Sequence, residues 1–215
     1  FESRGYDVAV HGQPQWNGVA IASRRGLADV HTGLPGGDEG QSRLIAATVA
    51  GVRIVNLYCP QGSSADSDNF QYKLRFYDAL LGWVAASLPA DAPALLLGDL
   101  NVAPKPEDVW DVAAFANVPT YHPMEHERWA ALVALGLRDV VEPHLPDDPK
   151  ARFTFWDYRG MAFRFNQGMR IDHVLATAPA AARVSAAGVH RGWRKKQGDQ
   201  TPSDHAPVWV DVADA

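Results

Sequence analysis

The sequence predicts a mixed α/β fold in layers, and three observations support this prediction. Short runs of alternating or continuous apolar residues recur along the whole chain and are typical of strands. Two longer segments carry apolar residues at helical spacing, and they lie among the strands rather than in a separate block. A chain of 215 residues, 47% of them hydrophobic, is long enough for one large core, so we expect a single domain over residues 1–215.

The first half of the chain is predicted to contain five strands and one helix. Residues 70–88 place apolar side chains at helical spacing and predict an amphipathic helix. The uninterrupted apolar run at residues 94–97 then predicts a strand covered on both faces. The Ala-Gly pair at residues 50–51 joins the alternating segments 43–49 and 52–58, which is typical of a hairpin. The expected strands are residues 6–11, 18–23, 43–49, 52–58 and 94–97.

The second half is predicted to be richer in strands. Residues 124–136 predict a second helix, with Gly136 suited to a position just past its end. Strands are expected at residues 153–158, 170–175, 183–190 and 207–212.

The composition limits the possible environments of the protein. No apolar run is long enough to cross a bilayer, so we expect no association with a membrane. The single cysteine, Cys59, cannot form an internal disulfide, suits a reducing compartment, and is expected to be a small buried apolar residue. The formal net charge of −5 neither requires nor forbids a polyanionic partner.

Polar groups follow one of the predicted strands directly. Asp99 and Asn101 are two residues apart, so strand alternation would point both to the same side. A carboxylate beside a carboxamide can seat a nucleophilic water molecule and a polar substrate atom. Taken alone, an Asp-x-Asn sequence after a strand is also common in turns and helix caps.

Two further segments place acidic groups beside imidazoles. Asp172 could hold the ring of His205 in one tautomer, which catalysis by histidine requires. Asp204 next to His205 adds an oxygen donor, and several Asp and Asn oxygens with few cysteines favour Mg²⁺ or Mn²⁺ over zinc. A single histidine is more often structural, so the joint occurrence of these groups carries the prediction.

Six blocks, in order, carry a resemblance to a known family. They are "YDVAVHGQPQWNGVAIASR", "VNLYCPQG", "LLLGDLNVAP", "FTFWDYR", "GMRIDHVLA" and "PSDHAPVWV". Together they resemble the exonuclease III family of AP endonucleases and DNA-repair nucleases, within the endonuclease/exonuclease/phosphatase superfamily. The resemblance implies a four-layer α/β sandwich of two packed mixed β-sheets flanked by helices. It also implies Mg²⁺-dependent hydrolysis of DNA phosphodiester bonds, at abasic sites and 3′ ends, by in-line attack of water.

The resemblance also implies roles for particular residues. Asp99 would activate or position the attacking water, and Asn101 would orient it or hold the phosphate. His205 would contact a non-bridging phosphate oxygen, with Asp172 paired to its imidazole. Tyr58 would assist near the phosphate or the leaving group.

The remaining implied roles concern metal and substrate. Asp204 would bind Mg²⁺ (or Mn²⁺) and Asn56 would support the site. Near the active face, Asn56, Arg43 and Lys73 would help to bind the substrate. An apolar pocket for an extrahelical sugar without its base would be formed by Phe155, Trp156 and Met169. A core role for the aromatic residues is the alternative, since alternation would separate Phe153 and Phe155 from Trp156. The expected partner is duplex DNA, bound by a monomer in a prokaryotic cytoplasm, at the nucleoid.

The clearest basic cluster is residues 190–196, "HRGWRKK", which contains Trp193. Lysine and arginine beside an aromatic ring can contact phosphates and pack on a duplex. A solvated loop is the alternative.

The chain also departs from the family pattern. Relative to the family, about fifty residues are expected before Phe1, a strand–helix–strand unit of the usual size, and they would supply a principal metal-binding glutamate. The segment by itself is therefore expected to bind metal weakly and to have little activity. Met169 and His173 stand where other residues are typical.

Two other functions fit the sequence. A phosphatase or phospholipase of the same superfamily would act on an inositol phosphate or a lipid. A non-catalytic scaffold would bind DNA without cutting it, although the complete set of polar residues argues against this function.

Overall fold

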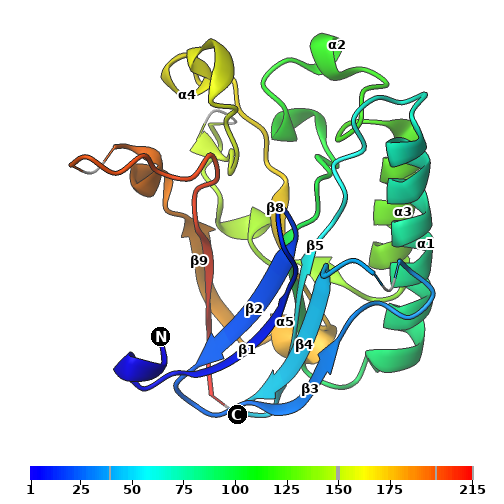
Figure 1. The fold of residues 1–215 in the computed structure, drawn as a ribbon, viewed down its shortest axis with the longest axis vertical. Helices are drawn as coiled ribbons and strands as arrows, with labels where there is room; N and C mark the ends of the chain where they lie inside the picture. Colours follow the sequence, from blue (N-terminus) through cyan, green and yellow to red (C-terminus); the bar gives the residue numbers. More distant parts are fainter. Residues whose placement is uncertain (39, 149–150, 197, 215) are drawn as a thin grey trace.

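A six-stranded mixed sheet forms the centre of the structure, with strand order β3-β4-β5-β6-β8-β7 (Figure 1). The structure is a computed structural model, and it describes residues 1–38, 40–148, 151–196 and 198–214. Strands β5 and β6 run parallel, and the other neighbouring pairs are antiparallel. The strands are β3 (Ala28–Thr32), β4 (Leu44–Val49), β5 (Val52–Tyr58), β6 (Ala94–Asp99), β7 (Arg138–Asp139) and β8 (Asp172–Ala176).

Two helices, α1 (Asp68–Ser87) and α3 (Pro123–Ala134), cover one face of this sheet (Figure 1). Ser67 caps α1 by accepting a hydrogen bond from the backbone N–H of Phe70, which satisfies a donor that the first helical turn leaves free. The apolar stripe of α1 then packs on β4, β5 and β6, chiefly through Phe76, Tyr77, Leu80 and Val84. Both helices therefore lie close to their predicted ranges.

Two antiparallel strand pairs cover the other face. The pair β1 (Asp7–Gly12) and β2 (Gly18–Ser23) packs on β4, and the pair β9 (Val184–Val189) and β10 (Val208–Val212) packs on β6 and β8. The mixed α/β class is confirmed. The expected second sheet is divided into two parts. Among the described strands, β1 and β2 pair only with each other, and so do β9 and β10.

Other elements are short and lie between the layers or at their ends. Residues 153–158 were predicted to be a strand, but only isolated bridges involve them, and β3 and β7 were not predicted. The short helices are α2 (Val112–Phe115), α4 (Ala162–Phe165) and α5 (Ala178–Ala181). The 3-10 turns are Glu2–Arg4, Pro106–Asp108, Glu142–His144, Arg159–Met161 and Arg191–Arg194. No described helix is long and apolar enough to cross a membrane.

A buried ionic cluster fixes the start of β8. The guanidinium of Arg170 donates to both carboxylate oxygens of Asp108, at 2.6 and 3.1 Å, and to Asp139 at 2.6 Å. All three side chains are at least nine-tenths buried. Burial by itself raises the pKa of Asp139, but the neighbouring His173 and Arg170 outweigh this effect and hold that pKa well below its usual range.

We expect Arg170→Met to lower the free energy of unfolding by about 3–5 kcal/mol, because it leaves two buried carboxylates without their cation. The pKa of Asp139 is lower in the folded state, so the stability it contributes is present above its unfolded pKa of about 4 and is lost as the pH falls below that value. Urea denaturation at neutral and acidic pH measures both effects.

The matched control is Arg159→Met, whose ion pair with Asp157 is exposed and is expected to change stability by less than about 1 kcal/mol. Equal effects of the two substitutions at neutral pH would contradict the structural role of Arg170.

Candidate active site

The polar side chains of the site begin as a row across three neighbouring strands. Tyr58 is opposite Asp99 in the β5–β6 pairing, and Asp99 is opposite Asp172 in the β6–β8 pairing. Residues directly opposite each other project from the same face of a sheet. In β6 that face also carries Leu95 and Leu97, which pack with β9 and β10, so the row lies on the face opposite α1.

His205 joins this row from the segment that leads into β10. Its Nδ1 lies 2.8 Å from Oδ2 of Asp172, and its ring packs on Phe155 with centroids 4.9 Å apart. A carboxylate only accepts hydrogen bonds, so we assign the Nδ1 proton to this contact. The Nε2 atom of His205 is then the ring atom that can meet a substrate.

A turn, rather than strand alternation, brings Asn101 to Asp99. Strand β6 ends at Asp99, and Asn101 adopts a left-handed backbone conformation with φ of 51°. Its backbone N–H and its Nδ2 each donate to a different carboxylate oxygen of Asp99, both at 2.9 Å, and Nδ2 also donates to the carbonyl of Cys59. The two residues are adjacent as expected, but for a different physical reason.

The loop that carries this turn is held by what we call the carbonyl clamp. Four consecutive backbone carbonyls, residues 100–103, each accept a hydrogen bond from a side chain of α1, α3 or β8. A loop has no ladder partners for its carbonyls, so these side chains satisfy them. The donors, in order, are the Tyr77 hydroxyl, Lys73 Nζ at 2.6 Å, His173 Nε2 at 2.8 Å and His126 Nε2 at 2.9 Å.

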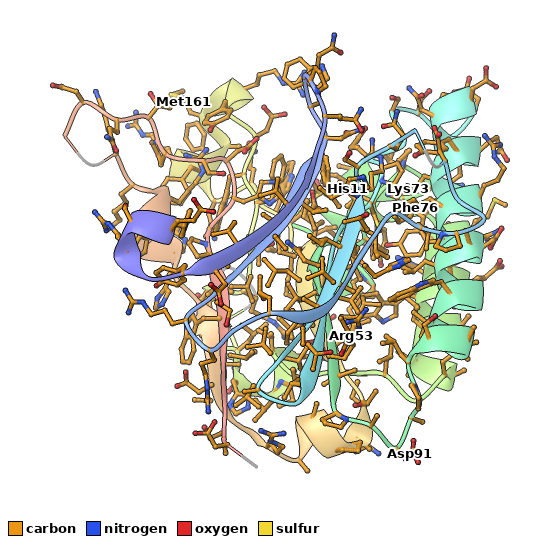
Figure 2. The ribbon with its side chains drawn as sticks, turned by 60° about the horizontal axis from the view of Figure 1, so that its bottom comes forward. His11, Arg53, Lys73, Phe76, Asp91 and Met161 are labelled. Atoms are coloured by element: carbon orange, nitrogen blue, oxygen red, sulfur yellow. The ribbon has the colours of Figure 1, made fainter. Side chains whose placement is uncertain are left out.

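Lys73 was predicted to contact substrate, and the structure contradicts this. Its side chain has no exposed surface; it forms an ion pair with the equally buried Glu125 and donates to the carbonyls of Asn101 and Gln61. Figure 2 shows Lys73 with Phe76 on the side of α1 that faces the sheet. The prediction came from a loose match to basic residues of the family, and lysines on amphipathic helices usually extend to solvent, so nothing in the sequence indicated this burial.

Other clamp residues carried signals that the sequence analysis did not use. Tyr77 follows Lys73 by four residues and therefore lies on the same helix face. Glu125 stands three residues after His122, where it accepts hydrogen bonds from the backbone N–H groups of Thr120 and His122 in a capping arrangement. His173, noted as atypical, is a buried clamp donor.

Gly98 allows β6 to approach β5 at the site. It has φ of +126°, and a Cβ there would lie 2.0 Å from the carbonyl oxygen of Leu57 and 2.9 Å from Oδ1 of Asn56. Any larger residue would therefore displace backbone at the site. Asn56 itself donates to the carbonyl of Ala20 at 2.9 Å, which ties β2 to the sheet.

Arg43 provides positive charge beside the row. Its guanidinium lies over the ring of Tyr58, 5.1 Å from the centroid, and donates to the Tyr58 carbonyl at 3.1 Å. It lines a polar cavity of about 490 Å³ that extends from Tyr58 to the turn between β1 and β2. A half-buried guanidinium in such a cavity is suited to binding an anion.

The aromatic block divides differently from the prediction. Trp156 is fully buried and packs against Phe153, so it belongs to the core and cannot line a substrate pocket. Phe155 and Met169 are half-buried and pair through their backbones, and Phe155 lies against His205. The segment is irregular, so strand alternation does not apply to it.

The site is acidic, and His205 carries positive charge within it. Burial and then the charge of Asp172 raise the pKa of Asp99 to about 7. Burial lowers the pKa of His205, but its hydrogen bond to Asp172 and the charges of Asp172, Asp99 and Asp204 outweigh this effect and raise it to about 9. Burial, followed by the charge of Asp99, raises the pKa of Tyr58. His205 is therefore protonated at neutral pH.

The same carboxylates are the candidates for metal binding. Asp204 is half-buried, and its backbone carbonyl accepts a hydrogen bond from the backbone N–H of Trp156 at 3.0 Å. Among the described residues, no group of three or more His, Cys, Asp or Glu side chains is arranged to hold an ion. The described residues alone therefore do not complete a metal site.

Carboxylates, a carboxamide and a protonated imidazole at the strand ends of an α/β sheet define a class of hydrolase that attacks phosphate esters with water. The chain belongs to the endonuclease/exonuclease/phosphatase family, whose model matches residues 2–205. Nucleases of this family depend on a divalent metal ion.

Individual relatives are similar over most of the chain. Exodeoxyribonuclease III of Haemophilus influenzae is 30% identical over 98% of this chain and 82% of its own. The 3′ phosphatase NExo from Neisseria, solved with a product DNA hairpin, is 36% identical with a TM-score of 0.92, covering 99% of this chain and 81% of that one. An AP endonuclease from Archaeoglobus fulgidus is 32% identical with a TM-score of 0.89, covering 98% and 80%.

We expect Asp172→Asn to lower the pKa of His205 from about 9 towards its usual value, because it removes the hydrogen-bonded charge and leaves only Asp99 and Asp204 to oppose burial, which favours the neutral ring. NMR titration of the His205 ring in protein stripped of divalent ions measures this pKa.

Asp211→Asn, an exposed position in β10 six residues beyond His205, is the control and should leave the titration unchanged. An equal His205 pKa in wild type and Asp172→Asn would show that the pair does not set the charge of the ring.

Proposed function

We propose that the protein hydrolyses phosphodiester bonds of duplex DNA at abasic sites and 3′ ends, in the manner of exonuclease III. The observation that carries the proposal is the row of Tyr58, Asp99 and Asp172, with His205 paired to Asp172 at 2.8 Å. The names of the relatives support DNA as the substrate, since they are exodeoxyribonucleases, AP endonucleases and a DNA 3′ phosphatase.

In the proposed reaction, Asp99 positions the attacking water and accepts its proton, while Asn101 holds the carboxylate of Asp99 in place. A bond forms between the water oxygen and phosphorus as the bond to the leaving oxygen breaks in line. Protonated His205 donates from Nε2 to a non-bridging oxygen and stabilises the charge that develops there. Asp172 fixes the orientation of His205.

Tyr58 is proposed to supply the proton for the leaving oxygen. Its raised pKa keeps the phenol protonated at neutral pH, and it lies in the same row as Asp99. Arg43 would bind an adjacent phosphate through its guanidinium, and Phe155 with Met169 would contact the sugar. Asn56 would act indirectly, by holding β2 against the sheet.

We propose Mg²⁺ or Mn²⁺ as the metal because the available donors are oxygen atoms, with Asp204 and Asp99 as ligands from this chain. A hard divalent ion would stabilise charge on the phosphate. We also propose that the protein acts as a monomer on abasic duplexes, in a prokaryotic cytoplasm at the nucleoid, where the reducing environment suits the buried thiol of Cys59.

We expect full-length protein to nick a duplex at a single abasic site with Mg²⁺ present, and chelation by EDTA to abolish the cut until Mg²⁺ is restored. Asp99→Asn should lower the rate about 10²–10⁴-fold, because it removes the proton acceptor. Asp91→Asn, at the far end of the molecule (Figure 2), is the matched control and should retain the wild-type rate.

The same assay separates the alternatives. Faster hydrolysis of a phosphoinositide than of the abasic duplex would favour a lipid or inositol phosphatase. Binding of the duplex without metal-dependent nicking would favour a scaffold.

A further inference from the structure

A small cavity lies beside His205. It has a volume of about 220 Å³, and residues that line it include Trp193, Lys195, Thr201, Ser203, His205 and Pro207. It shares His205 with the proposed active site and no residue with the Arg43 cavity.

Trp193 is presented to this cavity by two anchored neighbours. Its side chain is 61% exposed, which is unusual for a large aromatic residue. On one side Arg191 lies over the rings of Trp156 and Phe163, at 5.4 and 4.6 Å from their centroids. On the other, buried Arg194 donates to the carbonyl of Trp156 at 3.0 Å. The backbone is held on both sides, and both arginines lie over Phe163 of α4, so Trp193 is pre-positioned at the surface beside α4.

The opposite wall of the cavity is also fixed. The hydroxyl of Tyr158 donates to the carbonyl of Pro202 at 2.7 Å, and the hydroxyl of Ser203 accepts a hydrogen bond from the backbone N–H of His205 at 3.1 Å. These contacts fix Pro202 and Ser203 next to His205, the residue that we propose contacts the phosphate. A group bound here would be next to the reacting phosphate.

We propose that this cavity binds the base of the nucleotide that flanks the reacting phosphate, stacked on Trp193. The inference rests on the proposed function. The volume is below the roughly 300–1,000 Å³ of pockets for larger ligands and suits one flat ring system. Stacking on an aromatic side chain accepts any base. The exposed ammonium of Lys195 is placed to meet a backbone phosphate of the same nucleotide.

Stacking requires the base to leave the duplex, which costs least at an unpaired or terminal nucleotide. The cavity would therefore favour frayed 3′ ends over fully paired interior positions. Trp193 is a specificity-determining residue in this account, because it would select the state of the flanking nucleotide without touching the reacting atoms.

The experiment pairs changes in protein and in DNA. Duplexes carry 2-aminopurine or a base-free tetrahydrofuran at the nucleotide flanking the cleavage position, and binding is measured with Asp99→Asn as the background, so that the DNA stays intact. We expect quenching of 2-aminopurine fluorescence on binding, lost in Trp193→Leu and kept in Trp193→Phe. Trp193→Leu should weaken binding about tenfold when the base is present and leave base-free DNA unaffected.

Lys195→Gln should weaken binding to all these duplexes equally. It should also reduce the slope of log K, the binding constant, against log salt concentration by about one. Equal affinity of Trp193→Leu and Trp193→Phe for the base-containing duplex, or equal losses on both duplexes, would overturn the proposal. Failure of wild-type protein to cut any of these duplexes would instead count against the proposed function, since the stacking measurement does not depend on cleavage.

Discussion

The site depends on one constraint, which is that an irregular loop must hold Asp99 and Asn101 in a fixed relation. Beyond β6 the backbone has no strand to pair with, and the carbonyl clamp supplies the missing partners from α1, α3 and β8. The buried Lys73–Glu125 pair joins α1 to α3 beneath this loop. The helices that build the core therefore also set the geometry of the catalytic turn, so that packing and function are coupled.

The rest of the site follows from the register of the sheet. Tyr58, Asp99 and Asp172 are neighbours because β5, β6 and β8 are adjacent and in register, and Gly98 permits the close approach of β5 and β6. His205 enters from a different layer and meets Asp172. Burial, and then the charge of Asp172, raises the pKa of Asp99. The carboxylates raise the pKa of His205 against the effect of burial, so the acidic cluster holds a protonated imidazole at neutral pH.

Much of this was predictable from sequence, because periodicity and strand-end motifs are local signals. The two long helices, most strands and the meeting of Asp172 with His205 are as predicted. The remaining features depend on tertiary contacts, which a local pattern does not show. Lys73 is buried against Glu125, fifty-two positions away. Trp156 lies in the core, and residues 153–158 form no strand, so alternation does not describe its position. For Asn101 the sequence allowed either strand alternation or a turn, and the structure has the turn, since nothing local distinguishes the two.

The central claim is that the carbonyl clamp pre-organises Asp99 and Asn101 for attack on a phosphate. Tyr77→Phe tests it most directly, because it removes one hydroxyl from the carbonyl of Leu100 and keeps the ring that packs on the sheet. The measurement is the single-turnover rate of cleavage of an abasic duplex by full-length protein, with DNA affinity measured in parallel. The account predicts a rate at least about tenfold lower at unchanged affinity. A wild-type rate would contradict it.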